Sequence, residues 1–221
     1  MTEISDNYIE NLLVRCVAIA TSTWSDALDQ LELAGVIQGL QHRSGIGRIA
    51  GRAVTVKEVT GELGDHLLED FNVGAILAAG GAGEILIIDM GGYEISTFGG
   101  LAARAATNRN ITGVLIEGGC RDLDEIRATG LWLGSRHVTP LSGKRRAKVT
   151  GINIPIYIDG VEINPGDYIV ADTTGSIVIP AGRIEQVLEI AEELTARDMQ
   201  FEDALKQGQQ FGAIAQTLKH M

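Results

Sequence analysis

Cysteine and proline are both scarce in this sequence of 221 residues, which contains 2 cysteines and 4 prolines. The cysteines, Cys16 and Cys120, do not provide a disulfide framework, and without a Cys-x-x-Cys pair they do not indicate a zinc site. No apolar run approaches the roughly 18 residues that a membrane span requires. Residues Met1 to Leu12 lack the apolar core of a signal peptide. We therefore expect a cytoplasmic protein without a membrane partner.

Positive charge is also in short supply, with 18 Lys and Arg residues against 29 Asp and Glu residues and a formal net charge of -11. Because such a surface repels phosphate backbones, we do not expect nucleic acid as a partner. Glycine, by contrast, is abundant at 28 residues, and 45% of the residues are hydrophobic. Tight turns around a sizeable core are therefore expected. No Pro/Ser-rich linker divides the chain, so residues 1–221 are expected to form a single domain.

Helical and strand patterns alternate through the first half of the chain. Residues Asn7 to Ala18 have helical apolar spacing, and Ser25 is typical of the N-cap of a helix that ends at Gly35. Residues Gly51 to Val59 alternate and predict a strand. Three helices are then expected at Leu67–Ala79, Leu101–Asn108 and, as a short one, Asp122–Ala128. Two strands are expected between them, at Glu84–Asp89 and Gly113–Glu117. Apolar strands between helices favour an α/β fold with a parallel sheet covered on both faces.

The last third of the sequence has a different pattern. Short strands separated by turns are predicted at Ile154–Ile158, Val161–Ile163, Tyr168–Ala171 and Ser176–Ile179. Apolar residues at helical spacing then predict a long amphipathic helix over Arg183–Lys206. The tail 208–221 is expected to be extended or to pack on a neighbouring subunit.

The segment Glu117–Glu125 (EGGCRDLDE) is the first candidate site. It follows a buried strand and opens a helix, and the ligands of α/β sheets gather at the carboxyl ends of strands. Gly118 and Gly119 let a small ligand approach the backbone. Arg121 offers a planar fork for a carboxylate, and Asp122 offers a hard oxygen ligand for a cation such as Mg²⁺. A surface salt bridge or a helix N-cap would explain the same pair.

Two further segments suit an anionic ligand. Ser96–Ala103 (STFGGLAA) places two glycines before an Ala-rich helix, whose first N–H groups then face open space. A plain glycine turn is the alternative. The basic run Gly143–Lys148 (GKRRAK) either rims the entrance for an anionic substrate or forms a solvated loop.

Six segments of the sequence recur in the same order in a known family. They read TSTWSDAL, GIGRIAGRAVTV, EILIIDMGG, FGGLAARAA, GVLIEGGCRD and NPGDYIVADTTGSIVIP, within roughly residues 21 to 198. In these segments the chain resembles the RraA-like proteins and 4-hydroxy-4-methyl-2-oxoglutarate aldolases. The resemblance implies an α-β-β-α layered fold of the swivelling phosphohistidine-domain type. It also implies a homotrimer or homohexamer with active sites between subunits.

The resemblance assigns roles to the two candidate segments. Arg121 is implied to hold the carboxylate and keto oxygen of a pyruvyl group, and Asp122 is implied to bind Mg²⁺ or Mn²⁺. A small 2-oxo acid is the implied substrate. The loop implied to wrap the substrate carboxylate consists of Gly99, Gly100, Leu101 and Ala102.

The resemblance also implies an acid from the C-terminal region of a neighbouring subunit. Asp198 is the best match in this sequence, and Glu193 is the second. One position departs from the family pattern: the aldolases carry an acid separated from the arginine by twenty residues, whereas this sequence has Gly100 at that position. That loss should weaken metal binding or change the substrate.

Three functions follow from the resemblance and its one departure. The first is a metal-dependent lyase that cleaves a 4-hydroxy-2-oxo diacid to pyruvate or decarboxylates oxaloacetate through a pyruvate enolate. The retained Asp122 favours it. The second is a non-enzymatic regulatory or binding protein, which Gly100 favours. The third is a related 2-oxo-acid or sugar-acid enzyme in which Gly100 makes room for a larger substrate.

Overall fold

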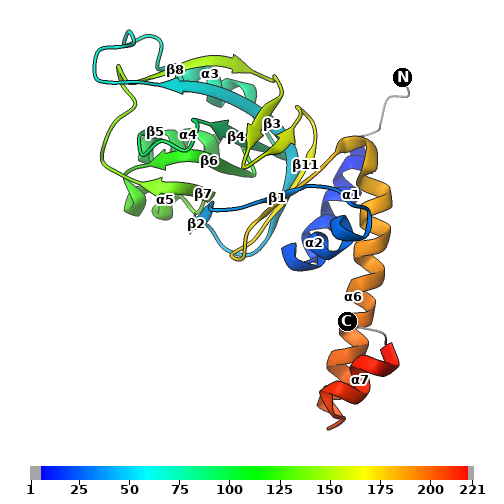
Figure 1. Ribbon diagram of the computed structural model, residues 1–221. Helices are drawn as coiled ribbons and strands as arrows, with labels where there is room; N and C mark the ends of the chain where they lie inside the picture. The colour runs from blue at the N-terminus through cyan, green and yellow to red at the C-terminus, as the bar shows by residue number, and fades with distance from the viewer. Residues whose placement is uncertain (1–5, 219–221) are drawn as a thin grey trace.

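A curled, mixed sheet organises the protein, for which a computed structural model describes residues 6–218. Its ten strands follow the order β1-β12-β11-β3-β4-β6-β7-β2, with β5 beside β6 and β8 beside β3 (Figure 1). The bounds are β1 (Val36–Ile37), β2 (Gln41–Ser44), β3 (Ile49–Thr60), β4 (Glu84–Asp89), β5 (Ser96–Phe98), β6 (Gly113–Cys120), β7 (Trp132–Val138), β8 (Ala147–Ile152), β11 (Tyr168–Ala171) and β12 (Ser176–Ile179). A separate hairpin joins β9 (Ile156–Ile158) and β10 (Val161–Ile163).

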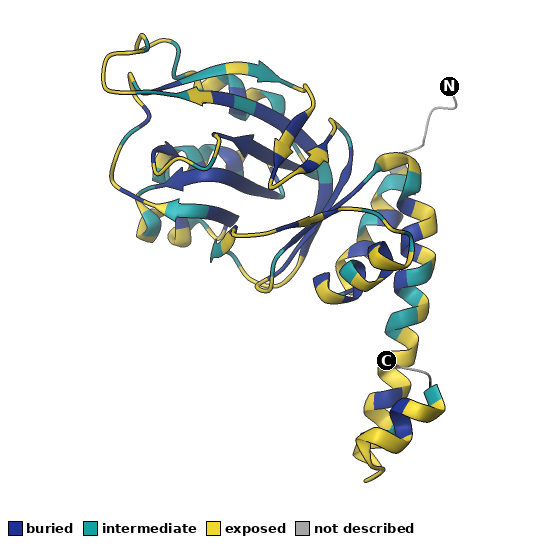
Figure 2. Cartoon of the chain, viewed as in Figure 1, coloured by how far each residue is buried: buried dark blue, intermediate teal, exposed yellow. Residues whose placement is uncertain are grey.

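The centre of the sheet is parallel, as the apolar strands predict. Strands β3, β4, β6 and β7 run parallel to one another, and all eight residues of β6 are buried. Figure 2 shows β4 and β6 almost entirely in the colour of buried residues. Because both faces are covered, the strands need apolar side chains on both sides and show no polar alternation.

Helices cover the sheet in two layers. They are α1 (Asp6–Ala18), α2 (Thr21–Gln30), α3 (Val73–Ala79), α4 (Gly100–Asn108), α5 (Leu123–Thr129), α6 (Ile184–Lys206) and α7 (Phe211–Leu218). Helices α3, α4 and α5 share one core with β3, β4 and β6, and α1, α2 and α6 share another with β11 and β12. A third core lies among the strands and the β9–β10 hairpin. The expected α-β-β-α layering is confirmed.

Two predicted helix starts were wrong. Ser25 lies inside α2, which already begins at Thr21, and this helix ends at Gln30 before Gly35. The helix predicted from Leu67 begins only at Val73, because the Asn72 side chain accepts a hydrogen bond from Ala75 N–H and caps it. The preceding residues form turns that apolar spacing alone does not reveal.

Five strands of the structure were not predicted from the sequence: β1, β2, β5, β7 and β8. They are short or partly polar, and β8 pairs antiparallel with β3 beyond the parallel core. Strands of this kind have weak local patterns, since their pairing partners determine them.

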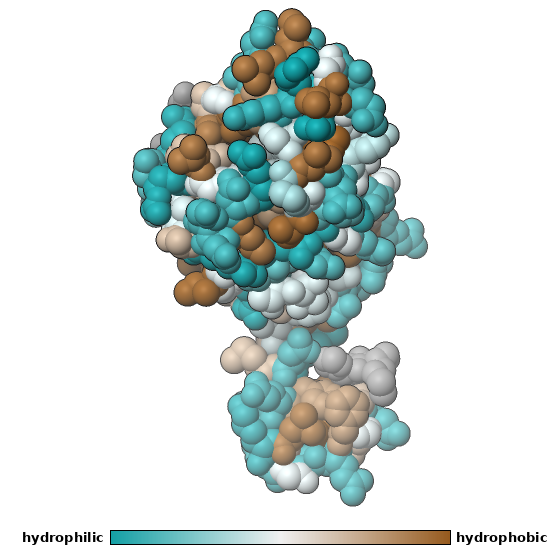
Figure 3. Space-filling view, turned by 90° about the vertical axis from the view of Figure 1, so that its left-hand side faces the viewer, coloured by the Kyte–Doolittle hydropathy of each residue, from teal (hydrophilic) through white to brown (hydrophobic). Residues whose placement is uncertain are grey.

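The C-terminal part of α6 and helix α7 form an arm that projects from the body, whereas the first half of α6 packs on it (Figure 1). Phe201 of α6 packs against Ile214 and Ala215 of α7 in a small separate core. Apolar side chains remain exposed on this arm, among them Met199 at 62% and Phe211 at 59%, and Figure 3 shows brown surface there. Of the tail 208–221, the described part packs on α6 of the same chain, and residues 219–221 lie outside the described residues. Within residues 6–218, no helix combines the length and apolarity of a membrane span.

Candidate functional site

Two neighbouring parallel strands bring the candidate segments together. Gly119 N–H donates to Ile95 O at 2.9 Å, and Arg121 N–H donates to Phe98 O at 2.9 Å. These bonds continue the pairing of β5 with β6 to the carboxyl ends of both strands. The glycines after β5 and the Arg-Asp pair after β6 therefore lie side by side.

Asp122 has a backbone conformation that few non-glycine residues adopt, with φ 54° and ψ 48°. Its side chain does not cap the following helix α5. Instead, Oδ2 accepts a hydrogen bond from Gly100 N–H at 3.2 Å and lies 3.6 Å from Arg121 Nε. The left-handed turn thus directs the carboxylate back toward the glycine loop. Backbone strain of this kind is concentrated at functional sites.

Gly99 is required by the approach of the Arg-Asp pair. A Cβ atom at this position would lie 2.6 Å from Asp122 Oδ2 and 3.2 Å from Arg121 Cγ. Real Cβ atoms do not approach other atoms as closely as the first of these distances. A side chain at position 99 would therefore displace the carboxylate, the guanidinium stem or both.

Gly100 has a different neighbour. A Cβ atom there would lie 2.6 Å from Cβ and 3.4 Å from Cγ of Glu125, an exposed residue of α5. Helix α5 therefore occupies the space that a side chain at position 100 would need. Glu125 therefore approaches α4 as closely as it does because position 100 has no side chain. The sequence alone does not indicate this contact.

A pocket of about 350 Å³ opens beside these residues. Its lining comes from the turn before α3, from α3, from β5 and the glycine loop, and from the loop before β8. The lining residues are Phe71, Val73, Gly74, Leu77, Ser96, Thr97, Gly99, Leu101, Ala102, Arg121, Asp122, Ser142 and Lys144. Arg121 and Asp122 also line a second hollow with Val138, Thr139 and Pro140. The pair thus stands between two cavities and is accessible from both.

The charges around the first pocket suit a small anion. Among the described residues, Arg121, Lys144 and Asp122 are its charged lining residues, so two cations face one carboxylate. The Arg121 and Asp122 side chains are 37% and 42% exposed, so each keeps part of its polar surface available to a ligand. The basic run Gly143–Lys148 contributes Lys144 to this lining, as one of the two sequence interpretations expected.

One acid near the pocket was not predicted from the sequence. Glu58 of β3 is 1% exposed, and its Oε1 accepts a hydrogen bond from Thr97 Oγ1 at 2.8 Å. Burial raises the pKa of Glu58 to about 7, against the lowering effect of the Thr97 bond. The available sequence signal was its spacing, because Glu58 continues the alternation of Val54 and Val56 in β3, and a carboxyl group buried in this way needs a partner.

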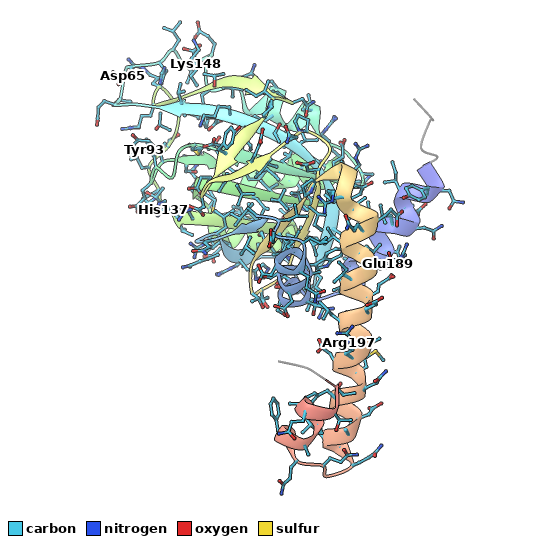
Figure 4. All side chains as sticks on the ribbon, turned by 45° about the vertical axis from the view of Figure 1, so that its right-hand side comes forward. Asp65, Tyr93, His137, Lys148, Glu189 and Arg197 are labelled. Atoms are coloured by element: carbon cyan, nitrogen blue, oxygen red, sulfur yellow. The ribbon has the colours of Figure 1, made fainter. Side chains whose placement is uncertain are left out.

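The predicted site residues fall into two groups. Gly99, Gly100, Leu101, Ala102, Arg121 and Asp122 lie together around the pocket. Glu193 and Asp198 belong to α6, where Arg197 pairs with Glu193 at 3.6 Å. Figure 4 places Arg197 on the projecting part of that helix, away from the body. Within one chain the arm therefore does not reach the pocket, and an approach from a neighbouring copy stays a prediction.

Comparison with known proteins decides the family. The RraA-like family model, described as Aldolase/RraA, matches residues 21–178. This chain belongs to the RraA-like family. The matched span contains both candidate segments and ends before α6, so the RraA-like core carries the pocket without the arm.

Several curated relatives are named as aldolases. A Halalkalibacterium halodurans protein provisionally named 4-hydroxy-4-methyl-2-oxoglutarate aldolase is 32% identical over 85% of each chain. A 4-hydroxy-4-methyl-2-oxoglutarate aldolase of Thermus thermophilus is 31% identical over 62% of this chain and 78% of its own. The Legionella pneumophila protein DlpA is 29% identical over 84% of this chain, but this chain spans only 30% of DlpA. A Methanocaldococcus jannaschii relative is likewise matched over 59% of its length.

Solved structures agree on the fold. A Pseudomonas syringae protein superposes with a TM-score of 0.84 at 24% identity, over 97% of this chain and 99% of its own. The RNA-processing inhibitor RraA of Thermus thermophilus superposes with a TM-score of 0.58 at 28% identity, over 71% of this chain and 91% of its own. The family thus includes both named aldolases and a named inhibitor of RNA processing.

Proposed function

We propose that this protein is a divalent-metal-dependent lyase that acts on small 2-oxo acids. The observation that carries the proposal is the Arg121–Asp122 pair, which lies beside a pocket of about 350 Å³ together with Lys144. A guanidinium, an ammonium and a carboxylate at one cavity are the groups that a short, doubly charged acid and a hard cation require. The aldolase names of the relatives support the same chemistry.

The donor set fits Mg²⁺ or Mn²⁺ bound together with substrate. Asp122 is the one carboxylate that lines the pocket, and residues 6–218 contain no group of three or more His, Cys, Asp or Glu side chains placed to hold a metal. Mg²⁺ commonly binds through one or two carboxylates and completes its shell with water and substrate oxygens. Asp122 would hold such an ion, which when bound polarises the keto oxygen of the substrate.

The protein's own residues would bind and orient the substrate. The planar fork of Arg121 suits the substrate carboxylate, and Lys144 adds a positive charge at the same pocket. The positive end of the α4 dipole lies at Gly99, which lines the pocket, and favours a negative charge there. When a carbon–carbon bond breaks beside the keto group, the enolate that remains is negatively charged. Arg121 would stabilise that charge.

Two substrates lead to this enolate. Cleavage of a 4-hydroxy-2-oxo diacid and decarboxylation of oxaloacetate both yield pyruvate after the enolate is protonated. The proposal is tested by incubating the purified protein with Mg²⁺ or Mn²⁺ and each substrate, with pyruvate release followed through lactate dehydrogenase and NADH. We expect release that EDTA abolishes and that Arg121→Ala reduces at least about 100-fold.

A matched control shows whether the loss of activity comes from removing an arginine at the pocket or from removing any exposed arginine. Arg104 is an exposed arginine of α4 that does not line the pocket, so Arg104→Ala should leave pyruvate release unchanged. Activity that persists both in EDTA and in Arg121→Ala rules out the lyase.

Two specific observations favour a second candidate, a regulatory binding protein of the RraA type. Gly100 lacks the acid that the aldolases are expected to carry, and a structural relative is named an inhibitor of RNA processing. A thermal shift separates the two functions, because a ligand that binds only the native state raises the melting temperature. Stabilisation by Mn²⁺ with oxalate favours the lyase, whereas the binding protein predicts no shift with any 2-oxo acid.

We further propose that the protein assembles as a homotrimer or homohexamer in the cytoplasm. The exposed apolar side chains of the α6–α7 arm, such as Met199 and Phe211, support a contact with another copy. Light scattering coupled to size-exclusion chromatography measures the mass directly, and a monomer of 23.5 kDa would contradict the assembly.

A further inference from the structure

Glu58 occupies an unusual place for a carboxyl group. It follows Val54 and Val56 on the face of β3 that packs against α3 and α4, and it is almost fully buried. Its Oε1 is bonded to Thr97 Oγ1, whereas its Oε2 is buried without a hydrogen-bond partner among the described residues. A carboxylate in such surroundings would keep one oxygen desolvated. The protonated form is therefore favoured there.

Thr97 connects this carboxyl group to the pocket. It is itself only 3% exposed, yet it lines the same cavity as Arg121 and Asp122. A hydroxyl has a single proton to donate. When Glu58 is ionised, Thr97 donates that proton to Oε1. When Glu58 is protonated, the carboxyl O–H can donate to Thr97 Oγ1, and the threonine proton is released to point into the pocket.

Within residues 6–218, no opposite charge holds Glu58 in its ionised form. On the strands packed around it, Lys57 of β3 pairs with Asp89 of β4 at 2.6 Å, and Lys148 of β8 pairs with Asp70 at 3.2 Å. Arg52 of β3 and Glu84 of β4 lie opposite each other at the far end of these strands. Strand β5 carries no charged residue. Burial is accordingly the main cause of the raised pKa of Glu58, and no charged group contributes to it.

We propose that Glu58 and Thr97 form a proton-donating pair behind the pocket, which delivers a proton through the Thr97 hydroxyl to a bound 2-oxo acid anion. The inference rests on the proposed lyase for its chemical role. Thr97 Oγ1 gives its proton to the enolate carbon and takes the proton of Glu58 in the same step. The products are neutral threonine, ionised Glu58 and pyruvate, and Glu58 regains a proton from water through the same hydroxyl. Glu58 acts through Thr97 and is a positioning residue, whereas Thr97 touches the substrate.

The first test measures how many protons the protein takes up when an anion binds, and it does not require catalytic activity. An anion in the pocket makes ionised Glu58 less favourable, so binding should draw a proton from solution near pH 7.5. Titration calorimetry with oxalate at saturating Mg²⁺, repeated in buffers of different ionisation enthalpy, gives the number of protons taken up. We expect uptake of up to about one proton by the wild type. Glu58→Gln and Thr97→Val should lose most of it, and Thr97→Ser should restore it.

Glu117→Gln is the matched control. Glu117 is also a buried glutamate with a pKa raised by burial, but it is bonded to Arg136 and does not line either cavity beside Arg121. Proton uptake should therefore persist in this variant. Equal uptake by the wild type and Glu58→Gln overturns the proton-donating pair.

The second test uses pyruvate formation. Since the protonated carboxyl is the active form, kcat/KM of the wild type should fall as pH rises through about 7, and kcat should fall at a higher pH because the bound anion disfavours ionised Glu58. Glu58→Gln should lower kcat by about 100-fold with little change in KM and should remove this step from the pH profile. Circular dichroism and the melting temperature show whether the isosteric variant is folded.

The outcomes distinguish this inference from the lyase itself. If the protein takes up a proton in a Glu58-dependent way but forms no pyruvate, the lyase is ruled out, and the proton exchange between Glu58 and Thr97 is still supported. If Glu58→Gln forms pyruvate with an unchanged pH profile, the proton-donating pair is ruled out and the lyase is still supported. If the wild type neither binds oxalate nor forms pyruvate, both the lyase and the proton-donating pair are ruled out.

Discussion

The backbone N–H of Gly100 donates a hydrogen bond to Asp122 Oδ2 at 3.2 Å, across twenty-two positions of sequence. This bond joins the loop after β5 to the end of β6, and it orients a carboxylate whose own backbone is in the left-handed region. The candidate site therefore depends on how closely two chain segments approach each other. Both glycines of the loop are consequently sensitive positions.

Substitution of Gly99 should disrupt the Arg-Asp pair while leaving the fold intact. In Gly99→Ala the new Cβ would lie 2.6 Å from Asp122 Oδ2, so the carboxylate must move. Since small displacements at a reacting centre have large effects, we expect binding of oxalate to weaken roughly tenfold to hundredfold. Isothermal titration measures the affinity, and Gly182→Ala, where nothing lies within 4 Å of the new Cβ, is the control. Unchanged affinity in Gly99→Ala would contradict the site geometry.

The packing of Gly100 against Glu125 predicts a strong coupling between these two positions. In Gly100→Ala the new Cβ would lie 2.6 Å from Glu125 Cβ, and overpacking of this kind destabilises by about 1–3 kcal/mol. Glu125→Gly removes the colliding atom at a cost of roughly 1 kcal/mol for glycine in a helix. Urea unfolding of both single variants and the double variant should therefore give a favourable coupling energy. Additive effects would show that α4 and α5 do not pack in this way.

The same contact makes a prediction about the missing acid. Restoring an acid at position 100 requires α5 to move, so Gly100→Asp alone should lower the melting temperature. We expect it to raise pyruvate release less than Gly100→Asp combined with Glu125→Gly. A full gain of activity in the single variant, without loss of stability, would contradict this expectation.

Glu58 should make folding stability depend on pH. Its pKa is raised from an ordinary value of 4.5 to about 7, so between these values the folded state holds a proton that the unfolded chain has released. Stability from this group is complete below pH 4.5 and is lost as pH rises to about 7, by roughly 3 kcal/mol in total. Glu58→Gln removes this dependence. Urea unfolding at pH 5, 6, 7 and 8 should give a difference between variant and wild type that grows up to pH 7 and then levels off.

Mixed assemblies test the acid expected from the arm. If Asp198 reaches the pocket of a neighbouring copy, Arg121→Ala and Asp198→Ala each abolish function at different places in one shared site. Unfolding and refolding the two inactive variants together should then restore part of the pyruvate release, because some sites receive both intact residues. Glu193→Ala, the second-best match, serves as the comparison. Lack of recovery in mixtures whose subunits have exchanged would rule out Asp198 as the intersubunit acid.

The sequence by itself indicated the layered fold through its family resemblance, and its pattern indicated the parallel strands β4 and β6 and the location of Arg121 and Asp122 at a strand end. Continuous apolar runs such as Glu84–Asp89 have one stable environment, a sheet covered on both faces, so local pattern and tertiary position coincide. Gly99 and Gly100 at the start of α4 were also identifiable, since two adjacent residues without side chains leave room beside the first turn of a helix. The structure fills part of that room with Asp122, whose Oδ2 accepts a hydrogen bond from Gly100 N–H.

Only the tertiary structure decided which side chains meet. The contact of Gly100 with Glu125 joins two helices, and the bond of Glu58 with Thr97 joins two strands that are not neighbours in sequence. The start of α3 at Val73, later than Leu67, was likewise decided by a capping bond that the Asn72 side chain accepts from Ala75 N–H. Local periodicity records which residues are buried, whereas distances between segments depend on the packing of the whole chain. For that reason the pair Arg121–Asp122 was predictable, whereas the contact that places Glu58 behind its pocket was not.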